Sequence, residues 1–389
     1  MNVIPGLEIL LRDRLDLLRG KRIGILSNPT SVDRGLRHIV DLLWNHREVV
    51  VTALMGPQHG ARGETQDNMI EWRDYRDSVT SLPVFSLYSH TRRPTPEMLG
   101  EIDTLVIDLQ DVGARIYTYI YSMAMAMAAC REVDVEVIVL DRPNPINGAD
   151  VEGPVLEPEF SSFVGLYPLP IRHGLTIAEL ARYFNEEMGI GCRLEVVPMS
   201  GWRRHMFFAE TGLPWVIPSP NLPTPDTALV YPGVVLFEGT NLSEGRGTTR
   251  PFELSGAPWV RPERLLPLLE DLDLDSVTFR PVFTVPTFHK WAGDLLGGVQ
   301  IHVTDRRNFK PFRTGLGLLL AYRSLDSDHF EWRAPPYEYE FEKLPFDILC
   351  GTDSIRLQIE AGCDLESIES SWKADLDRFK RIRSGYLLY

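Results

Sequence analysis

Short apolar runs alternate with segments of helical periodicity in the first half of the chain. The apolar runs, rich in Val, Ile and Leu, predict strands at 22–27, 49–55, 84–87, 104–109 and 135–140, with an edge strand at 193–197. The segments between them predict helices at 35–44, 117–132 and 176–188. Continuous apolar strands that alternate with helices are typical of a parallel sheet covered on both faces. We therefore expect an α/β fold whose N-terminal domain is Rossmann-like.

The pattern changes after a proline-rich stretch, residues 213–232. Because proline lacks an N–H and clashes with the preceding turn, we expect no helix in this stretch and a domain boundary within it. Beyond it, strands are predicted at 277–285 and 298–304 and helices at 312–324 and 365–381. The sequence thus predicts two domains, a parallel-sheet domain of residues 1–226 and a smaller α+β domain of residues 227–389.

Composition narrows the class of protein. Lys and Arg number 40 against 54 Asp and Glu, a net charge of −14, and such a surface repels phosphate backbones, so we expect no nucleic-acid partner. No apolar run approaches the roughly 18 residues of a membrane span, so no membrane partner is expected either. The first eight residues lack a signal-peptide pattern, which favours a cytoplasmic location. The four cysteines form no C-x-x-C pair, so we expect reduced thiols and no structural zinc.

Polar residues follow four of the predicted strands. In an open parallel sheet, ligands bind outside the carboxyl ends of the strands. The residues expected to line one crevice there are Asn28, His59, Arg62, Asp111, Arg115 and Asn144. The same residues also suit structural roles: a histidine in a turn, an aspartate that caps a helix or holds Arg115, or an asparagine in a turn.

A second polar cluster lies just beyond the predicted boundary, at 237–249. It brings Glu238, Asn241, Glu244 and Arg246 together with several glycines. An arginine between two glycines indicates close approach to a ligand, so we expect this loop to close the crevice. The chain has no dinucleotide-binding, Walker A, H-E-x-x-H or G-x-S-x-G motif, and we expect no cofactor or metal.

Six segments carry a resemblance to a known family. They are SNPTSVD (27–33), GPQHGARGETQ (56–66), DLQDVGARIYTYI (108–120), DRPNPINGADVEGP (141–154), PSPNLPT (218–224) and EGTNLSEGRGTTRPFELSGAPW (238–259). With these motifs the chain resembles the NamZ-type exo-β-N-acetylmuramidases from about residue 6 to its last residues. The resemblance implies a cleft between the two domains and release of N-acetylmuramic acid from the non-reducing end of peptidoglycan fragments. Because this sugar carries a carboxylate, arginine partners are expected, namely Arg62, Arg115 and Arg246.

The two polar clusters supply the candidates for a glycosidase site. As catalytic residues we expect Asp111, Glu64, Glu244 and His59, with Glu238 as a further carboxylate candidate, since glycosidases usually need two carboxylates. As substrate contacts we expect Asn28, Gln58, Arg62, Arg115, Tyr119, Asn144, Asn221, Glu238, Asn241 and Arg246. The expected partner is a small amino sugar or muropeptide.

One position departs from the family pattern. Where the resemblance implies a catalytic glutamate before His59-Gly60, this chain has Gln58. An amide exchanges no proton as an acid or base at neutral pH. Two alternatives therefore stay open beside hydrolysis of a muramoyl glycoside: a non-hydrolytic muropeptide-binding protein, and an enzyme for another glycoside. For Gln58 itself we expect a hydrogen bond to substrate, with the chemistry resting on Asp111 or Glu64.

Overall fold

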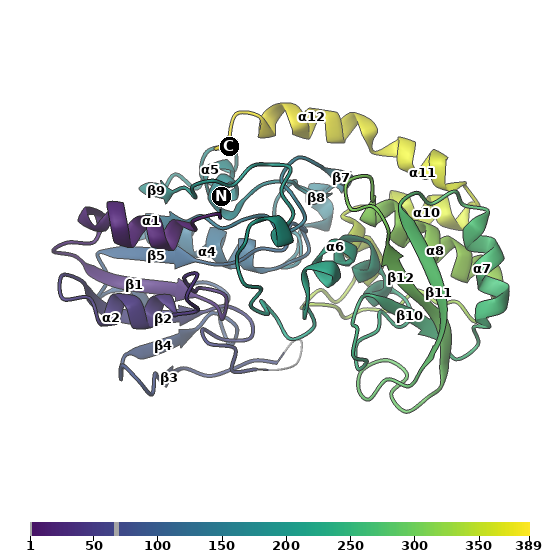
Figure 1. Cartoon of the computed structure of the whole chain (residues 1–389), viewed down its shortest axis with the longest axis horizontal. Helices are drawn as coiled ribbons and strands as arrows, with labels where there is room; N and C mark the ends of the chain where they lie inside the picture. The colour runs from purple at the N-terminus through teal and green to yellow at the C-terminus, as the bar shows by residue number, and fades with distance from the viewer. Residues whose placement is uncertain (1, 66–69) are drawn as a thin grey trace.

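The computed structural model describes residues 2–65 and 70–389; Gln66, the last residue of the 56–66 motif, lies outside them. The chain forms two bodies that lie side by side (Figure 1). The first holds a sheet of seven strands and the second a sheet of three, and helix α12 (Lys373–Arg383) runs along the top towards the first body. The expected fold class, a parallel-sheet α/β domain followed by a smaller domain, is confirmed.

The large sheet has the order β3-β4-β2-β1-β5-β6-β9. Its strands are β1 (Arg22–Ser27), β2 (Val50–Gly56), β3 (Tyr75–Arg76), β4 (Pro83–Ser86), β5 (Thr104–Asp108), β6 (Glu136–Leu140) and β9 (Leu194–Val197). Six strands are parallel and match the predicted ones. The antiparallel strand β3 was not predicted, because two residues are too short for a periodic pattern.

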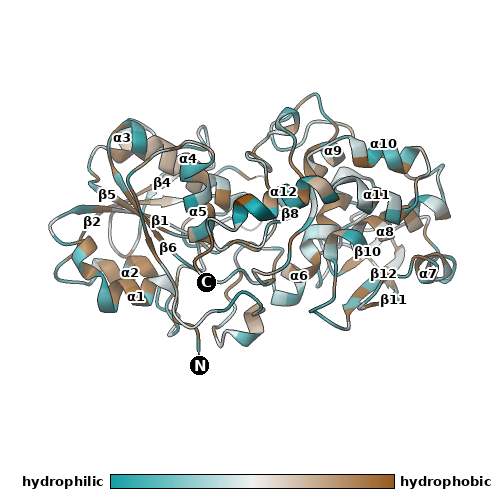
Figure 2. Ribbon diagram, turned by 90° about the horizontal axis from the view of Figure 1, so that it is seen from above, coloured by the Kyte–Doolittle hydropathy of each residue, from teal (hydrophilic) through white to brown (hydrophobic). Residues whose placement is uncertain are grey.

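Side chains of the parallel strands alternate between two cores, as a strand period of two requires. Ile23 and Ile25 of β1 pack with α1 (Gly6–Asp13) and α2 (Ile39–Trp44). Leu26 faces the opposite core, which contains α3 (Pro96–Leu99), α4 (Tyr119–Glu132) and α5 (Ile177–Glu186). Figure 2 shows these two sets of helices on opposite faces of the sheet. Both faces of the sheet are therefore covered.

Two helix predictions before residue 240 need correction. Helix α2 begins at Ile39 rather than at residue 35, because Leu36 adopts a left-handed conformation, φ 63°, and His38 caps the helix. The proline-rich stretch contains a helix after all, α6 (Pro225–Val234). Pro225 occupies the first turn, where a missing N–H costs nothing. Pro232 lies in the last turn, after which the chain continues as a 3-10 helix, Val235–Gly239.

The second body is built on the antiparallel sheet β10-β12-β11. Its strands are β10 (Leu254–Ala257), β11 (Val277–Thr284) and β12 (Leu296–Val303). Its helices besides α6 are α7 (Pro262–Glu270), α8 (Pro311–Leu325), α9 (Pro345–Cys350), α10 (Ser354–Glu360) and α11 (Leu365–Ser371). The single helix predicted at 365–381 is two, α11 and α12, separated at Trp372. A two-stranded ribbon, β7 (Glu152–Val155) with β8 (Pro170–Arg172), lies between the bodies.

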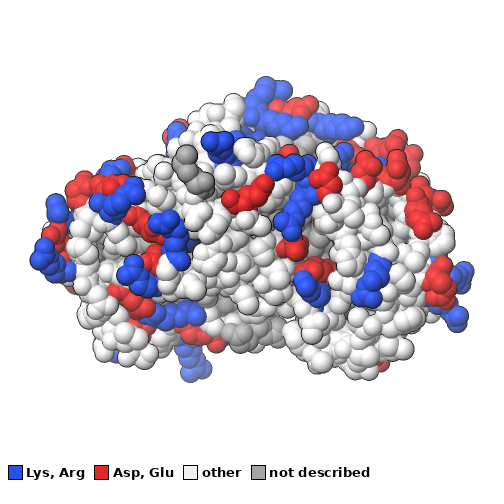
Figure 3. Space-filling view, viewed as in Figure 1, with Lys and Arg blue, Asp and Glu red and all other residues white. Residues whose placement is uncertain are grey.

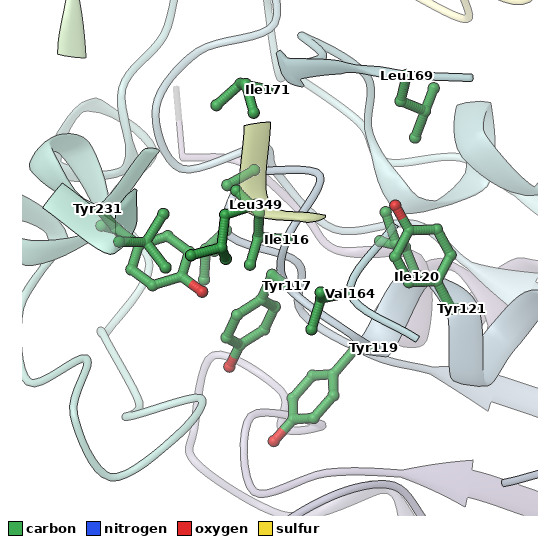
Figure 4. Packing of buried hydrophobic residues seen from close by; sticks show 14 of the residues in the cluster. Ile116, Tyr117, Tyr119, Ile120, Tyr121, Val164, Leu169, Ile171, Tyr231 and Leu349 are labelled. Atoms are coloured by element: carbon green, nitrogen blue, oxygen red, sulfur yellow. The ribbon is translucent and has the colours of Figure 1, made fainter. Parts of the chain in front are cut away.

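Both bodies share one hydrophobic core. Ile116, Tyr117 and Val164 of the first body pack beside Tyr231 and Leu349 of the second (Figure 4). The rings of Tyr117 and Tyr231 meet edge to face, with centroids 6.2 Å apart. Because this core is continuous, the two bodies are held together by buried apolar surface as well as by the chain.

The surface is mixed in charge. Figure 3 shows basic side chains gathered over α12, whose last turn contains Lys380, Arg381 and Arg383, while acidic and basic side chains are interspersed elsewhere on this face. Cys130, Cys192 and Cys350 are buried, and Cys363 is half-buried; all four are free thiols. Within 2–65 and 70–389, no helix has the length and apolarity that crossing a bilayer requires.

Candidate active site

A narrow cavity of about 50 Å³ lies where the two bodies meet. Both contribute to its walls. The lining residues from the first body are Gln58, His59, the Ile116–Tyr119 segment, Val164 and the Ser219–Leu222 segment; those from the second are Tyr231, Glu238, Arg246, Phe252, Tyr337 and Glu338. Of the residues predicted from the sequence, Gln58, His59, Tyr119, Asn221, Glu238 and Arg246 line this cavity.

The carboxyl end of β2 positions Gln58 and His59. The chain turns sharply here, and a Cβ at Gly56 would overlap the backbone nitrogen of Ala61, so glycine is required. His59 itself adopts φ 72°. The hydroxyl group of Tyr119 lies 3.1 Å from the backbone oxygen of Gln58 and 2.9 Å from that of Pro218. The turn thereby presents the Gln58 side chain to the cavity beside Thr118, whose hydroxyl is 3.4 Å from Oε1.

Glu238 is held by two donors. Nη2 of Arg246 donates to Oε1 over 2.7 Å, and the Tyr337 hydroxyl donates to Oε2 over 2.7 Å. The carboxylate is buried, so these two hydrogen bonds replace its lost hydration. The second body thus supplies to the cavity a buried carboxyl group whose position is fixed by an arginine and a tyrosine.

Glu338 is the second carboxylate of the cavity. Burial, and then the negative charge of Glu238, raise the pKa of Glu338 to about 7. The Tyr88 hydroxyl donates to Oε2 over 3.2 Å. Glu338 and Tyr339 both have left-handed backbones, with φ 44° and 68°, so a tight turn aims the carboxyl group into the cavity. Near neutral pH a substantial fraction of Glu338 is therefore protonated.

Glu244, predicted to be catalytic, lies behind Arg246 and does not line the cavity. Its Oε2 accepts 2.9 Å from Lys290, and its Oε1 is 3.2 Å from Nδ1 of His289 and 3.4 Å from Nε of Arg246. Burial alone would raise the pKa of Glu244, but these cations, Lys290 foremost, lower it. Glu244 therefore carries a permanent negative charge that holds Arg246 in place.

Two arginines predicted to bind the sugar have structural partners instead. Arg115 is fully buried and donates 2.8–2.9 Å hydrogen bonds to the backbone carbonyls of Pro154, Leu169 and Leu349. Arg62 forms ion pairs with Asp41 and Asp77 at 2.8 and 2.9 Å. Neither is among the residues that line the cavity.

Three further candidates are placed away from the cavity for similar reasons. Asp111 accepts from Gly113 N over 2.7 Å and lies 3.1 Å from Nε2 of the buried His173. Glu64 is exposed and accepts from the Tyr75 hydroxyl and the Arg62 backbone N–H. Asn144 bonds to the backbone at Ile146 and Leu175.

The last two predicted contacts also have partners within the protein. Asn28 accepts from the hydroxyls of Thr30 and Ser31, and its side chain lies near the Tyr119 hydroxyl. Asn241 joins its loop to the backbone of His329 and Glu331. Strand-end position alone does not separate ligand contacts from groups that fasten the loops.

The ionisable cavity residues that the sequence analysis missed come mainly from the second body, which contributes Tyr231, Tyr337 and Glu338, whereas the first contributes Tyr117. Glu338 and Tyr337 stand in an acidic and aromatic run after two prolines, a pattern that reads as a surface turn. Their one signal is that carboxylates alternate with tyrosines there, which is unusual for a solvated loop. No three His, Cys, Asp or Glu side chains are grouped to hold a metal ion in the part of the chain that the structure describes.

Comparisons with known proteins agree with this architecture. Residues 23–226 match the N-terminal profile of the exo-β-N-acetylmuramidase NamZ, and residues 229–389 match its C-terminal profile. The peptidoglycan β-N-acetylmuramidase NamZ of Bacillus subtilis is 47% identical over 387 residues, which span all of this chain and 91% of that protein.

Two crystal structures of DUF1343 family proteins from Bacteroides fragilis are similar to the whole chain. Their TM-scores are 0.91 and 0.78 at 37% and 33% identity, and the match covers 99% of each of those chains. Full-length identity at this level and matches in both domains assign the family. The chain belongs to the NamZ family of exo-β-N-acetylmuramidases, which are glycoside hydrolases acting on peptidoglycan.

Proposed function

We propose that this protein releases N-acetylmuramic acid from the non-reducing end of peptidoglycan fragments, with Glu338 as the proton donor and Glu238 as the second carboxylate. The observation that carries this assignment is the pair itself. Two buried glutamates line one cavity in different surroundings: Arg246 and Tyr337 donate hydrogen bonds to Glu238, whereas burial raises the pKa of Glu338 to about 7. Glycosidases use such a pair to protonate the leaving oxygen and to stabilise the oxocarbenium-like transition state.

In this assignment Glu338 transfers its proton to the glycosidic oxygen as the bond to the anomeric carbon breaks. Ionised Glu238 stabilises the positive charge that develops on the sugar ring. Arg246 and Tyr337 fix the position of Glu238 by hydrogen bonds to its two carboxylate oxygens. A water molecule completes hydrolysis by adding its oxygen to the anomeric carbon, and its released proton restores Glu338.

Gln58 binds the sugar in this scheme. Its amide accepts and donates hydrogen bonds, and a sugar hydroxyl or acetamide offers both partners. The catalytic carboxyl groups in this scheme are Glu238 and Glu338, in place of Asp111 and Glu64, which the sequence suggested. It leaves the family's glycosidase activity possible without a glutamate at position 58.

Turnover of a chromogenic β-N-acetylmuramide tests the assignment. We expect the wild-type protein to hydrolyse it, Gln58→Ala chiefly to raise KM, and Glu338→Gln to lower kcat. The second candidate function, muropeptide binding without hydrolysis, is favoured by Gln58 alone. That candidate replaces ours if the wild-type protein binds the sugar without turnover and Gln58→Glu creates activity.

A further inference from the structure

A second hollow, of about 500 Å³, adjoins the active-site cavity. Glu338 forms part of the wall of both. Its other lining residues include Arg92, Ser162, Phe163, Tyr339 and Glu71, and Arg92 is the one arginine or lysine among the described residues that line it. Arg92 follows β4, so it stands at the same carboxyl edge of the sheet as Gln58.

Arg92 is fixed in place by aromatic rings. Its guanidinium carbon lies 4.0 Å from the ring centroid of Tyr88 and 4.5 Å from that of Tyr339. Its side chain is 17% exposed. A guanidinium stacked in this way is oriented before any ligand arrives, so little entropy is lost on binding.

The hydrogen-bonding capacity of this hollow is only partly used. Nη1 of Arg92 donates to the backbone oxygen of Ser89, and Nη2 reaches Glu71 only at 3.5 Å. Buried Nε of Arg92 and buried Oγ of Ser162 have no hydrogen-bond partner within residues 2–65 and 70–389. Groups of this kind usually mark a place where a ligand or water binds.

The position of Glu71 indicates which chemical group of a ligand suits this hollow. Its side chain is 51% exposed, and Oε1 accepts 3.0 Å from the Tyr339 hydroxyl while facing Arg92. A carboxylate from solvent can therefore replace it between the same two donors. By contrast, Arg62, Arg115 and Arg246 are committed to Asp41 and Asp77, to backbone carbonyls, and to Glu238 and Glu244.

We propose that Arg92, with Ser162 and the Tyr339 hydroxyl, binds a carboxylate of the substrate and so selects muramoyl sugars over neutral amino sugars. This inference rests on the proposed function, because it takes the cleaved sugar to lie beside Glu338. The carboxylate belongs either to the lactyl ether of the sugar or to a peptide attached to it.

The test uses two chromogenic β-glycosides that differ only in the lactyl group, an N-acetylmuramide and an N-acetylglucosaminide. Arg92→Gln should lower kcat/KM for the muramide by roughly ten- to a hundredfold, the effect of one charged hydrogen bond, and should change the glucosaminide rate less than about twofold. Arg93→Gln is the matched control, since the exposed Arg93 pairs with Glu132. Glu71→Gln removes the competing carboxylate and should raise affinity for the muramide.

A third substrate, the muramide amidated with L-alanine, locates the carboxylate. If Arg92→Gln lowers kcat/KM for this amidated substrate as strongly as for the free muramide, Arg92 binds the peptide carboxylate. If kcat/KM for the amidated substrate is unaffected, Arg92 binds the lactyl carboxylate. Equal losses for the muramide and the glucosaminide would overturn the proposal. If the wild-type protein cleaves no glycoside, the proposed function fails, and calorimetric binding of free N-acetylmuramic acid against N-acetylglucosamine still decides the role of Arg92.

Discussion

The hydroxyl group of Tyr337 donates a 2.7 Å hydrogen bond to Oε2 of Glu238, and the next residue, Glu338, lines the same cavity. One turn of the second body therefore both fixes the Glu238 carboxyl group and supplies the second carboxyl group of the cavity. Because Tyr337 and Glu338 are separate residues, single substitutions can test the two roles independently.

The pH dependence of turnover should report Glu338. The pKa of this carboxyl is raised to about 7, and the proton donor must be protonated, so kcat/KM should fall as the pH rises above about 7. Glu338→Gln should remove this alkaline limb and lower kcat by about 10²–10⁴-fold. A pH–rate profile of both proteins measures this. A wild-type profile that stays flat from pH 6 to 9 would exclude Glu338 as the donor.

Tyr337→Phe should remove one of the two hydrogen bonds to Glu238 and leave the carboxyl group in place. Losing one hydrogen bond to a charged group costs about 1.5 kcal/mol, so kcat should fall on the order of tenfold. Steady-state kinetics with the chromogenic muramide measure the change. Tyr386→Phe is the control, since that hydroxyl bonds to Glu187 at the surface, and it should leave kcat unchanged. Unaltered kcat in Tyr337→Phe would mean that Arg246 alone holds Glu238.

Arg115→Met should destabilise the fold and leave sugar selectivity unchanged. The substitution removes the Arg115 donor from two buried carbonyl oxygens, those of Pro154 and Leu349, one in each body, whereas the Leu169 carbonyl keeps the Leu156 N–H. The free energy of unfolding should therefore fall by about 3–5 kcal/mol. Denaturant titration measures this, with Arg19→Met at an exposed ion pair as the control. If a folded Arg115→Met protein loses muramide binding selectively, Arg115 contacts the substrate after all.

Lys290→Met should destabilise the protein in a pH-dependent way. The pKa of Glu244 is lower in the folded protein than in the unfolded chain. The ionised carboxylate therefore stabilises the fold at pH values above its unfolded pKa of about 4.3. This stabilisation is lost as the pH falls through the pKa of Glu244 in the folded protein. The variant should lose about 3 kcal/mol at pH 7, and the difference from wild type should shrink below about pH 4. Lys380→Met, at an exposed pair with Asp377, is the control for denaturant titrations at both pH values. A difference that stays constant with pH would assign Lys290 to its carbonyl partners, Phe237 and Leu242.

The sequence predicted the parallel sheet because its strands are continuous apolar runs, whose burial on both faces leaves a clear pattern. Helix α6 was missed because the rule against proline holds for helix interiors and not for the first turn, where Pro225 lies. Six of the residues that line the cavity were named from the sequence: His59 from a strand end, Glu238 and Arg246 from the loop at 237–249, and Gln58, Tyr119 and Asn221 from the resemblance. Arg115 and Arg62 were assigned to the sugar because charge alone does not reveal a buried partner. Glu338 was missed because its importance depends on burial and on Glu238, a hundred residues away in sequence.

The last residues of the chain belong physically to the first body. The Tyr389 hydroxyl donates to Asp141 over 2.7 Å and accepts from the backbone of Met199 over 2.6 Å, and its ring meets Trp202 edge to face. During synthesis at 5–20 residues per second, about 160 further residues must emerge after residue 226, which takes roughly 8–30 s. During that time the nascent parallel-sheet domain lacks the Tyr389 contacts to Asp141, Met199 and Trp202. The first body therefore gains its last contacts only after the whole second body has been translated. A ribosome that stalls shortly before residue 389 leaves the first body without these contacts and the second body without its last residues.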